Sequence, residues 1–261
     1  MTKKILFCIV FFIISLIICV IYKAPSDKVI SNLKLSDYIV LYKSNNSLWD
    51  GFLSAAEING IRINNISWSM EGMLFLNGIS LKIDDDNFTK AKMIVKLTEF
   101  NEEIEVFKIV GHSRLKNILK TLKYINDDMN LSGEIDYKFD KVKYHFNKNI
   151  VDAKGLVLIN NISLENPFDS TSVLEFGDVD IAVDTKGFSK AVSLNITIQG
   201  NECVTDDLVI VINLSDNTFS IKGKISVTPQ TNEYVTNMLK ELASRVLSDG
   251  TEFEIDYNGS L

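Results

Sequence analysis

The chain has 261 residues, 46% of them hydrophobic, which is enough for one large core or two small ones. Its formal net charge is −7, and all 34 acidic residues but only 24 of the 27 basic residues lie beyond residue 23. Residues 24–261 therefore offer a poor surface for nucleic acid or for anionic lipid headgroups.

An apolar run of eighteen residues opens the chain, from Ile5 to Tyr22, with Lys3 and Lys4 before it. As a helix it would be about 27 Å long, close to the thickness of a bilayer's hydrocarbon core. It lacks the short apolar centre and the small-residue cleavage site of a removable signal peptide. We therefore expect residues 1–23 to form a cytoplasmic tip and a single transmembrane anchor. The positive-inside rule places the rest of the chain across the membrane.

Cysteine usage fits that placement. Cys8 and Cys19 lie inside the apolar run, and Cys203 is the only other cysteine of the chain. The part beyond the anchor therefore cannot form a disulfide within itself.

Residues 24–37 read as a polar linker, and a β-rich domain is expected over residues 38–261. Tyr38–Tyr42 is its first short strand. The pattern is organised around residues 48–70, which hold both tryptophans, Trp49 and Trp68. Apolar residues recur there at a strand's period of two, and the phase slips at Asn64 and Asn65. Such a slip indicates a turn or a bulge between two core strands.

Alternating strands are next expected at Ile79–Ile83, Met93–Leu97 and Ile104–Val110. Residues 84–87, with three consecutive aspartates, form a turn between the first two. A calcium loop at these acids would need further spaced ligands and a bidentate glutamate, which the sequence does not supply.

The period then changes to that of a helix. Four apolar residues stand at helical spacing, namely Leu115, Ile118, Leu119 and Leu122. The opposite side is basic, with Arg114, Lys116, Lys120 and Lys123. Two interpretations remain open: a solvated face, or a surface that docks on an acidic partner or on lipid headgroups.

From residue 131 the strand period returns. Leu131–Phe139 and Val142–Phe146 read as a hairpin with its turn at Asp140 and Lys141. Further strands are expected at 156–164, 174–183, 194–198, 208–214 and 219–227, with a bulge at Gly177. The segment 208–214 is apolar on both phases, whereas 219–227 alternates with serine and lysine.

A second helix is expected after Pro229, with an apolar stripe of Val235, Met238, Leu239, Leu242 and Val246. Residues 249 and 250 end it, and Phe253–Leu261 forms the last strand. The predicted fold class is therefore mainly β, a twisted antiparallel sheet or sheets with two amphipathic helices, preceded by the transmembrane helix.

A short internal repeat is also present. Residues 63–66 and 159–162 both read Ile-Asn-Asn-Ile, and each word lies in a run of strands that leads to one helix. Two stacked β-plus-helix units, over residues 38–125 and 131–261, would account for the repeat.

No catalytic constellation is apparent. His112 and His145 have no carboxylate or cysteine at ligand spacing and read as boundary residues rather than as bases or metal ligands. No nucleophile motif, phosphate-binding glycine loop or dinucleotide fingerprint occurs. We expect no enzyme activity, no metal and no cofactor, and an anchored hydrolase is the least favoured interpretation.

Several short motifs resemble the type II secretion system protein N family (general secretion pathway protein N). The N-terminal group is Leu48-Trp49-x-Gly51, then Gly60, then Ile66-Ser67-Trp68. The C-terminal group is Pro229, the leucine-rich helix, Gly250, and a closing Tyr257-x-Gly259-x-Leu261. The likeness spans nearly the whole chain.

This resemblance implies a non-enzymatic accessory or scaffold component of the machine that exports folded proteins across the outer membrane. Such a component stands in the bacterial inner membrane as a single-pass protein with a periplasmic β domain. Its partners would be other secretion-system subunits, with no nucleic acid. The alternative is an anchored β protein that handles lipid or lipoprotein and shields an acyl chain on an apolar sheet face.

Overall fold

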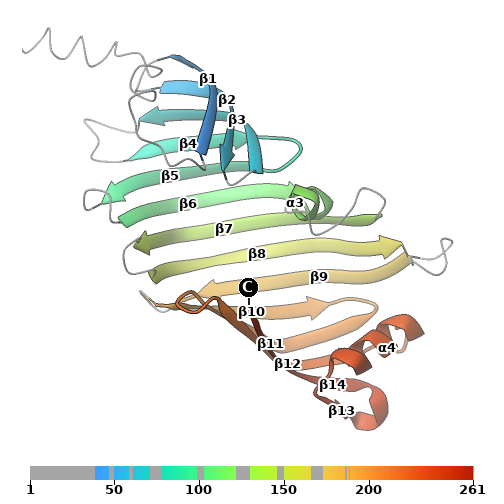
Figure 1. The fold of residues 1–261 in the computed structure, drawn as a ribbon. Coiled ribbons are helices and arrows are strands. Elements are labelled where there is room, and N and C mark those ends of the chain that lie inside the picture. Colours follow the sequence, from blue (N-terminus) through green and yellow to red (C-terminus); the bar gives the residue numbers. More distant parts are fainter. Residues whose placement is uncertain are drawn as a thin grey trace, which may run out of the picture. The chain divides into compact units, whose positions relative to one another are not determined.

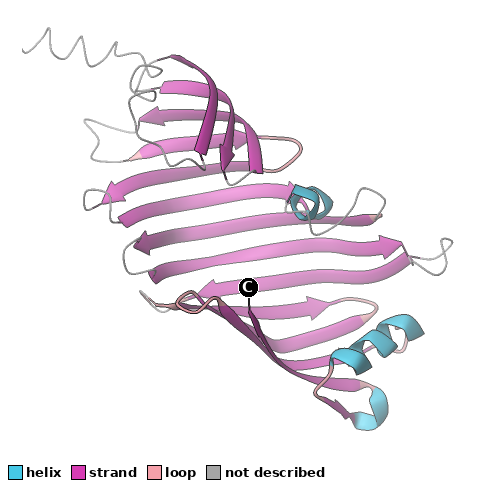
Figure 2. Ribbon diagram, viewed as in Figure 1, coloured by secondary structure: helices cyan, strands magenta, loops and turns pink. Residues whose placement is uncertain are grey.

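The computed structural model describes residues 39–46, 50–58, 61–70, 78–98, 103–121, 130–145, 150–165, 173–185, 187 and 189–260. The chain forms two compact units, residues 1–85 and 86–261. Figure 1 and Figure 2 show that the described part of each unit is built on antiparallel strands. The predicted mainly β class with two helices is thus confirmed.

The first unit is a meander of four antiparallel strands. They are β1 (Ile39–Asn46), β2 (Asp50–Ile58), β3 (Ile61–Met70) and β4 (Ile79–Asp84). Each strand pairs with the next one along the chain. The small residues Ala55 and Ala56 on β2 are 0% and 4% exposed, so the described core of this unit lies along β2.

The phase slip at Asn64 and Asn65 is a local backbone feature inside one strand, β3, and neither a turn nor a register shift interrupts the pairing with β2 there. Asn65 adopts a left-handed backbone conformation, with φ 54°, which asparagine tolerates better than most residues. Next to it, the buried carboxylate of Asp85 accepts hydrogen bonds from the backbone N–H (2.7 Å) and the side-chain amide (2.8 Å) of Asn64. The aspartate therefore satisfies backbone groups at the point where pairing with β4 stops.

The second unit holds the longer strands: β5 (Lys90–Thr98), β6 (Glu103–Arg114), β7 (Leu131–His145), β8 (Ile150–Glu165), β9 (Val173–Asp184), β10 (Ala191–Gln199), β11 (Cys203–Asn213), β12 (Thr218–Val227), β13 (Arg245–Leu247) and β14 (Glu252–Ser260). They lie in chain order from β5 to β12, followed by β14 and then β13. Every pairing is antiparallel. In the described part of this unit the helices are α3 (Leu115–Thr121) and α4 (Glu233–Leu242).

The predicted hairpin at Asp140 and Lys141 is wrong. These residues lie inside β7, a single strand of 15 residues, and the pairing with β8 shifts register between Phe139 and Lys141. One extra residue, Asp140, is accommodated as a bulge rather than as a turn. A phase change in the sequence looks the same in both cases, and only the neighbouring strands decide between them.

The second helix ends earlier than its apolar stripe suggests. Val246 lies on the short strand β13, directly opposite Phe253 of β14. The helix stops at Leu242 because Ala243 and Ser244 have turned into the sheet, where the Ser244 N–H donates to the Glu254 carbonyl (2.9 Å). Pairing with β14 therefore outweighs the local helical pattern at this point.

The start of α4 is fixed by polar contacts. Asn232 is the N-cap, and its side chain accepts a hydrogen bond from the Tyr234 N–H (2.9 Å). The buried Glu202 carboxylate accepts the Asn232 N–H (2.7 Å). With both ends held, Val235 and Leu239 of α4 pack on Phe253 in the best-buried cluster of this unit.

The two Ile-Asn-Asn-Ile words share one backbone feature. Asn161 in β8 has φ 54°, like Asn65 in β3, and its N–H donates to the Asp178 carboxylate (2.8 Å). The bulge expected at Gly177, with φ 74°, lies in β9, opposite the Ile-Asn-Asn-Ile segment of β8. The two predicted halves of the domain stay a prediction.

The predicted anchor, from Ile5 to Tyr22, lies outside the described residues, as do the linker and four motif positions, Leu48, Trp49, Gly60 and Leu261. Among the residues that are described, neither helix has the length and apolarity needed to cross a bilayer.

Candidate functional site

The motif residues that the structure describes form local contacts and are not gathered into one site. Trp68 lies opposite Gly51 in the β2–β3 ladder, and a Cβ at Gly51 would overlap the indole ring. At the C-terminal end Phe219 covers Gly259 in the same way, and its ring lies 5.8 Å from that of Tyr257. These residues therefore act in sheet packing.

The remaining motif positions also have structural places. The Ser67 hydroxyl lies 3.5 Å from the Lys82 carbonyl. Pro229 follows the end of β12 and is exposed, and Gly250, with φ 91°, lies in the short 3-10 turn Ser248–Gly250 before β14. None of them contributes a reactive group.

The second unit presents one continuous apolar sheet face. Alternate residues along a strand point to the same side, so the register identifies rows of side chains that cross the sheet on one face. One row crosses eight strands: Ile109, Phe139, Gly155, Val183, Leu194, Ile210, Ile221 and Tyr257. The next row crosses six: Gly111, Tyr137, Val157, Ile181, Ile196 and Leu208. Neither row contains a charged residue.

Aromatic rings lying over glycines recur on this face. Tyr137 covers Gly111, and Phe139 covers Gly155, each directly opposite its glycine in the ladder. Burial raises the pKa of the Tyr137 hydroxyl, and this effect outweighs the opposing hydrogen bond with Thr89 (2.7 Å). Because such rings lie along the sheet instead of standing up from it, they cover neighbouring backbone.

The two helices lie near the same end of the strands, α3 beside β6 and β7 and α4 beside β9, β12 and β14 (Figure 1). Leu115 of α3 packs near Gly133 on β7, and α4 packs over Phe253 of β14. The cluster of Val151, Ala153 and Val183 lies toward the other end of β8 and β9 and is packed only by strand residues and the adjoining Leu214. Within the described residues, that end of the face therefore has no covering helix.

The opposite face is charged, and several of its charges are paired. Lys141 binds Asp152 (2.5 Å), Lys222 binds Asp256 (3.5 Å), and the exposed His112 Nδ1 lies 2.9 Å from Asp136. The histidine contact was not visible in the sequence, because the partners are 24 residues apart and meet only through the β6–β7 register.

A half-buried part of this charged face holds Lys143. Burial alone lowers the pKa of its ammonium group, but Glu105 (3.4 Å) and Glu103 (3.5 Å) together raise that pKa above its ordinary value. The lysine therefore stays charged and ties β7 to β6.

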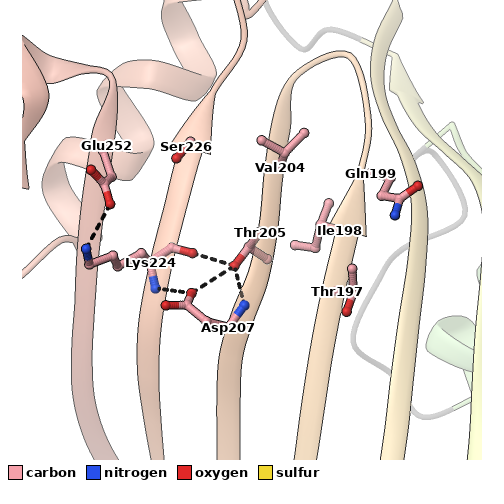
Figure 3. Close-up of a pocket in the computed structure, with 9 residues that line it drawn as sticks. All are labelled: Thr197, Ile198, Gln199, Val204, Thr205, Asp207, Lys224, Ser226 and Glu252. Carbon is pink, nitrogen blue, oxygen red and sulfur yellow. Dashed lines mark hydrogen bonds and ion pairs between the residues drawn. The ribbon is translucent and has the colours of Figure 1, made fainter.

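A polar hollow of about 500 Å³ lies where β11 bulges beside β10, β12 and β14. Figure 3 shows the residues that line it. The Asp207 carboxylate accepts the Lys224 N–H (3.0 Å), and the buried Thr205 hydroxyl donates to the Lys224 carbonyl. Lys224 and Glu252 form a hydrogen bond of 3.1 Å. This bond raises the pKa of the Lys224 ammonium group and lowers the pKa of the Glu252 carboxyl.

These contacts give the hollow a structural role. Its carboxylates are held by a backbone N–H and a lysine, and it has no histidine or cysteine lining. No group of histidine, cysteine and acidic residues suited to a metal ion occurs among the described residues. The arrangement closes a bulge, and the hydroxyls in its lining, on Thr197, Thr205 and Ser226, have no histidine beside them in that lining.

The alkylation rate of Cys203 tests whether its thiol is buried as the structure has it. Burial raises the pKa of its thiol, and the neighbouring Glu202 carboxylate raises it further, so the reactive thiolate is disfavoured. In a Cys8→Ser, Cys19→Ser variant, iodoacetamide at about pH 8 should alkylate folded Cys203 at least about tenfold more slowly than the unfolded chain. Intact-mass spectrometry over time measures both rates, and equal rates would contradict the burial of this thiol.

Searches with this chain found no matching protein-family model, no matching curated protein and no matching solved structure.

Proposed function

We propose that the chain is a non-enzymatic accessory component of the type II protein secretion system, anchored in the bacterial inner membrane with its β-rich part in the periplasm. The observation that carries this proposal is the pairing of Gly51 with Trp68. The two residues come from separate motifs of the N-terminal group, and they meet as ring and glycine across adjacent strands. The resemblance thus rests on residues that depend on one another in the fold.

The described surface supports action by contact. Ion pairs link several side chains of the charged face, the polar hollow has no histidine or cysteine in its lining, and long strands provide edges and faces for other subunits. Such a component would position partners beside the membrane instead of transforming a substrate.

Co-purification tests this function. The full-length protein, tagged at its C-terminus and cross-linked in membranes, should bring down other secretion subunits. The test variant is Trp68→Ala, which should reduce the recovery of those subunits because the contact with Gly51 is lost. A C-terminal reporter active only in the periplasm should be active. Recovery of no secretion subunit, together with unchanged secretion in a deletion strain, would exclude the proposal.

A second candidate function is favoured by the apolar face. At about 4.8 Å between strands, the eight-residue row spans about 34 Å, longer than one extended acyl chain. The row has no charged residue, so its occupant must be apolar along its length. The expected anchor keeps the protein at a bilayer, which is a source of acyl chains. The candidate activity is binding of a membrane lipid by its acyl chain.

A pair of neighbouring substitutions tests lipid binding. Ile181 lies on the apolar face, whereas the adjacent, exposed Ala182 lies on the other. Ile181→Asn should weaken binding of a fluorescent fatty acid about tenfold, whereas Ala182→Asn should leave it unchanged. Equal binding by both variants and the unmodified chain would remove this candidate.

A further inference from the structure

The outer edge of β14 is only partly occupied. On one side β14 pairs with β12 over its whole length, from Glu252 to Ser260. On the other side β13 pairs with Glu252, Phe253 and Glu254 alone. From Ile255 onward no strand in the described part of the chain pairs with this outer side.

The backbone groups of the open part point away from the sheet. The Glu254 carbonyl accepts the Ser244 N–H, so the N–H and C=O of Glu254 face the outer side. The register with β12 runs without a shift, and residues two apart in a strand present their backbone groups to the same side. Asp256 and Asn258 therefore direct their N–H and C=O groups outward, and both residues are exposed.

This edge has little of the usual protection against strand pairing. Natural sheets block exposed edges with charged side chains, especially lysine, and with proline, bulges or a covering element. The open part, Ile255–Ser260, has one charged residue, Asp256. The nine residues of β14 include neither proline nor lysine, and no bulge interrupts its pairing with β12. Tyr257, which is 54% exposed, adds apolar surface beside the open backbone groups.

The short strand β13 shows which sequence the edge accepts. Arg245 lies opposite Glu254 on the charged face, and Val246 lies opposite Phe253 on the apolar face. Beyond β13, the same two faces continue with Asp256 and Tyr257. A strand that extends the line of β13 would gain from a basic residue near Asp256 and an aliphatic one near Tyr257.

We propose that the outer edge of β14, from Ile255 to Ser260, binds an extended segment of a partner protein as an added antiparallel strand. The segment alternates basic and aliphatic residues, with the basic ones on the charged face. Backbone hydrogen bonds to Asp256 and Asn258 provide affinity, and the alternation provides specificity. This inference names a docking site for the proposed accessory function, but the geometry that carries it does not depend on the secretion system.

A peptide of defined sequence tests the edge directly. The probe is a fluorescent eight-residue peptide of four Arg-Val repeats, titrated into the full-length protein in detergent and followed by anisotropy. The controls are a peptide with four arginines followed by four valines, and a peptide of four Glu-Val repeats. The alternating basic peptide should bind at least about tenfold more tightly than either.

Three variants locate the binding to β14. Asn258→Pro removes an outward N–H and leaves the β12 ladder intact, so the dissociation constant should rise about tenfold, whereas Asn258→Ala should change it less than about twofold. Asp256→Lys should weaken the Arg-Val peptide and strengthen the Glu-Val peptide. Circular dichroism of each variant confirms that the sheet is retained.

Several results would overturn the inference. They are equal binding of the alternating and blocked peptides, unchanged affinity in Asn258→Pro, or self-association of the chain that Asn258→Pro abolishes. The last result would make a second copy the occupant. Peptide binding at this edge without co-purification of secretion subunits would preserve the docking site and remove the proposed function, so the two failures are distinguishable.

Discussion

Replacing Phe253 with alanine is expected to lower the free energy of unfolding of the second unit by about 3–5 kcal/mol. The ring is 0% exposed and packs with Leu174 of β9 and with Val235 and Leu239 of α4. Truncation leaves a cavity at the one place where α4, β9 and β14 share a core. No other described side chain of comparable size is as fully enclosed.

Denaturant unfolding followed by circular dichroism measures this loss, and limited proteolysis should show α4 cut first. The matched control is Tyr257→Ala on the same strand, which removes a ring of similar size from an exposed position and should cost less than about 1 kcal/mol. Equal losses in the two variants would mean that α4 does not depend on the Phe253 contact.

The second large effect is a coupling between Gly51 and Trp68. Gly51→Ala should cost about 1–3 kcal/mol, because its new Cβ would occupy the place of the indole ring and force it to move. In a Trp68→Ala background the same change should cost almost nothing, since the ring is gone. The double-mutant cycle should therefore give a coupling energy above about 1 kcal/mol.

The same unfolding assay measures all four members of the cycle. Ser67→Ala is the control next to Trp68, because its hydroxyl makes only a long contact of 3.5 Å with the Lys82 carbonyl. It should be additive with Gly51→Ala. Strict additivity of Gly51→Ala with Trp68→Ala would show that the ring does not rest on the glycine, and it would weaken the proposed meaning of the motif.

The strands were predictable where alternation is regular. The segment 219–227 falls inside β12, and its intervening lysines and serines lie on the charged face as a period of two requires. The irregularities at Asn65 and Gly177 were also visible, because asparagine and glycine accept the positive φ that these positions adopt. In both cases the information is local.

The candidate surfaces were less predictable. The segment 208–214 showed two apolar phases, but only the register shows that Leu208 and Ile210 continue rows that begin on β6. The hollow beside Asp207 depends on a bulge between Val204 and Val209 that the sequence does not mark. Neither the ion pair of Lys224 with Glu252 nor the open edge of β14 has a signature along the chain.

By itself, the sequence determined which residues alternate, which form helices and where the backbone needs asparagine or glycine, since these depend on neighbours only a few positions away. The tertiary structure alone decided that Asp140 is a bulge, that α4 stops at Leu242, and that Trp68 meets Gly51. Each of these outcomes depends on hydrogen bonds and ring contacts between strands, and therefore on a register that no single segment specifies.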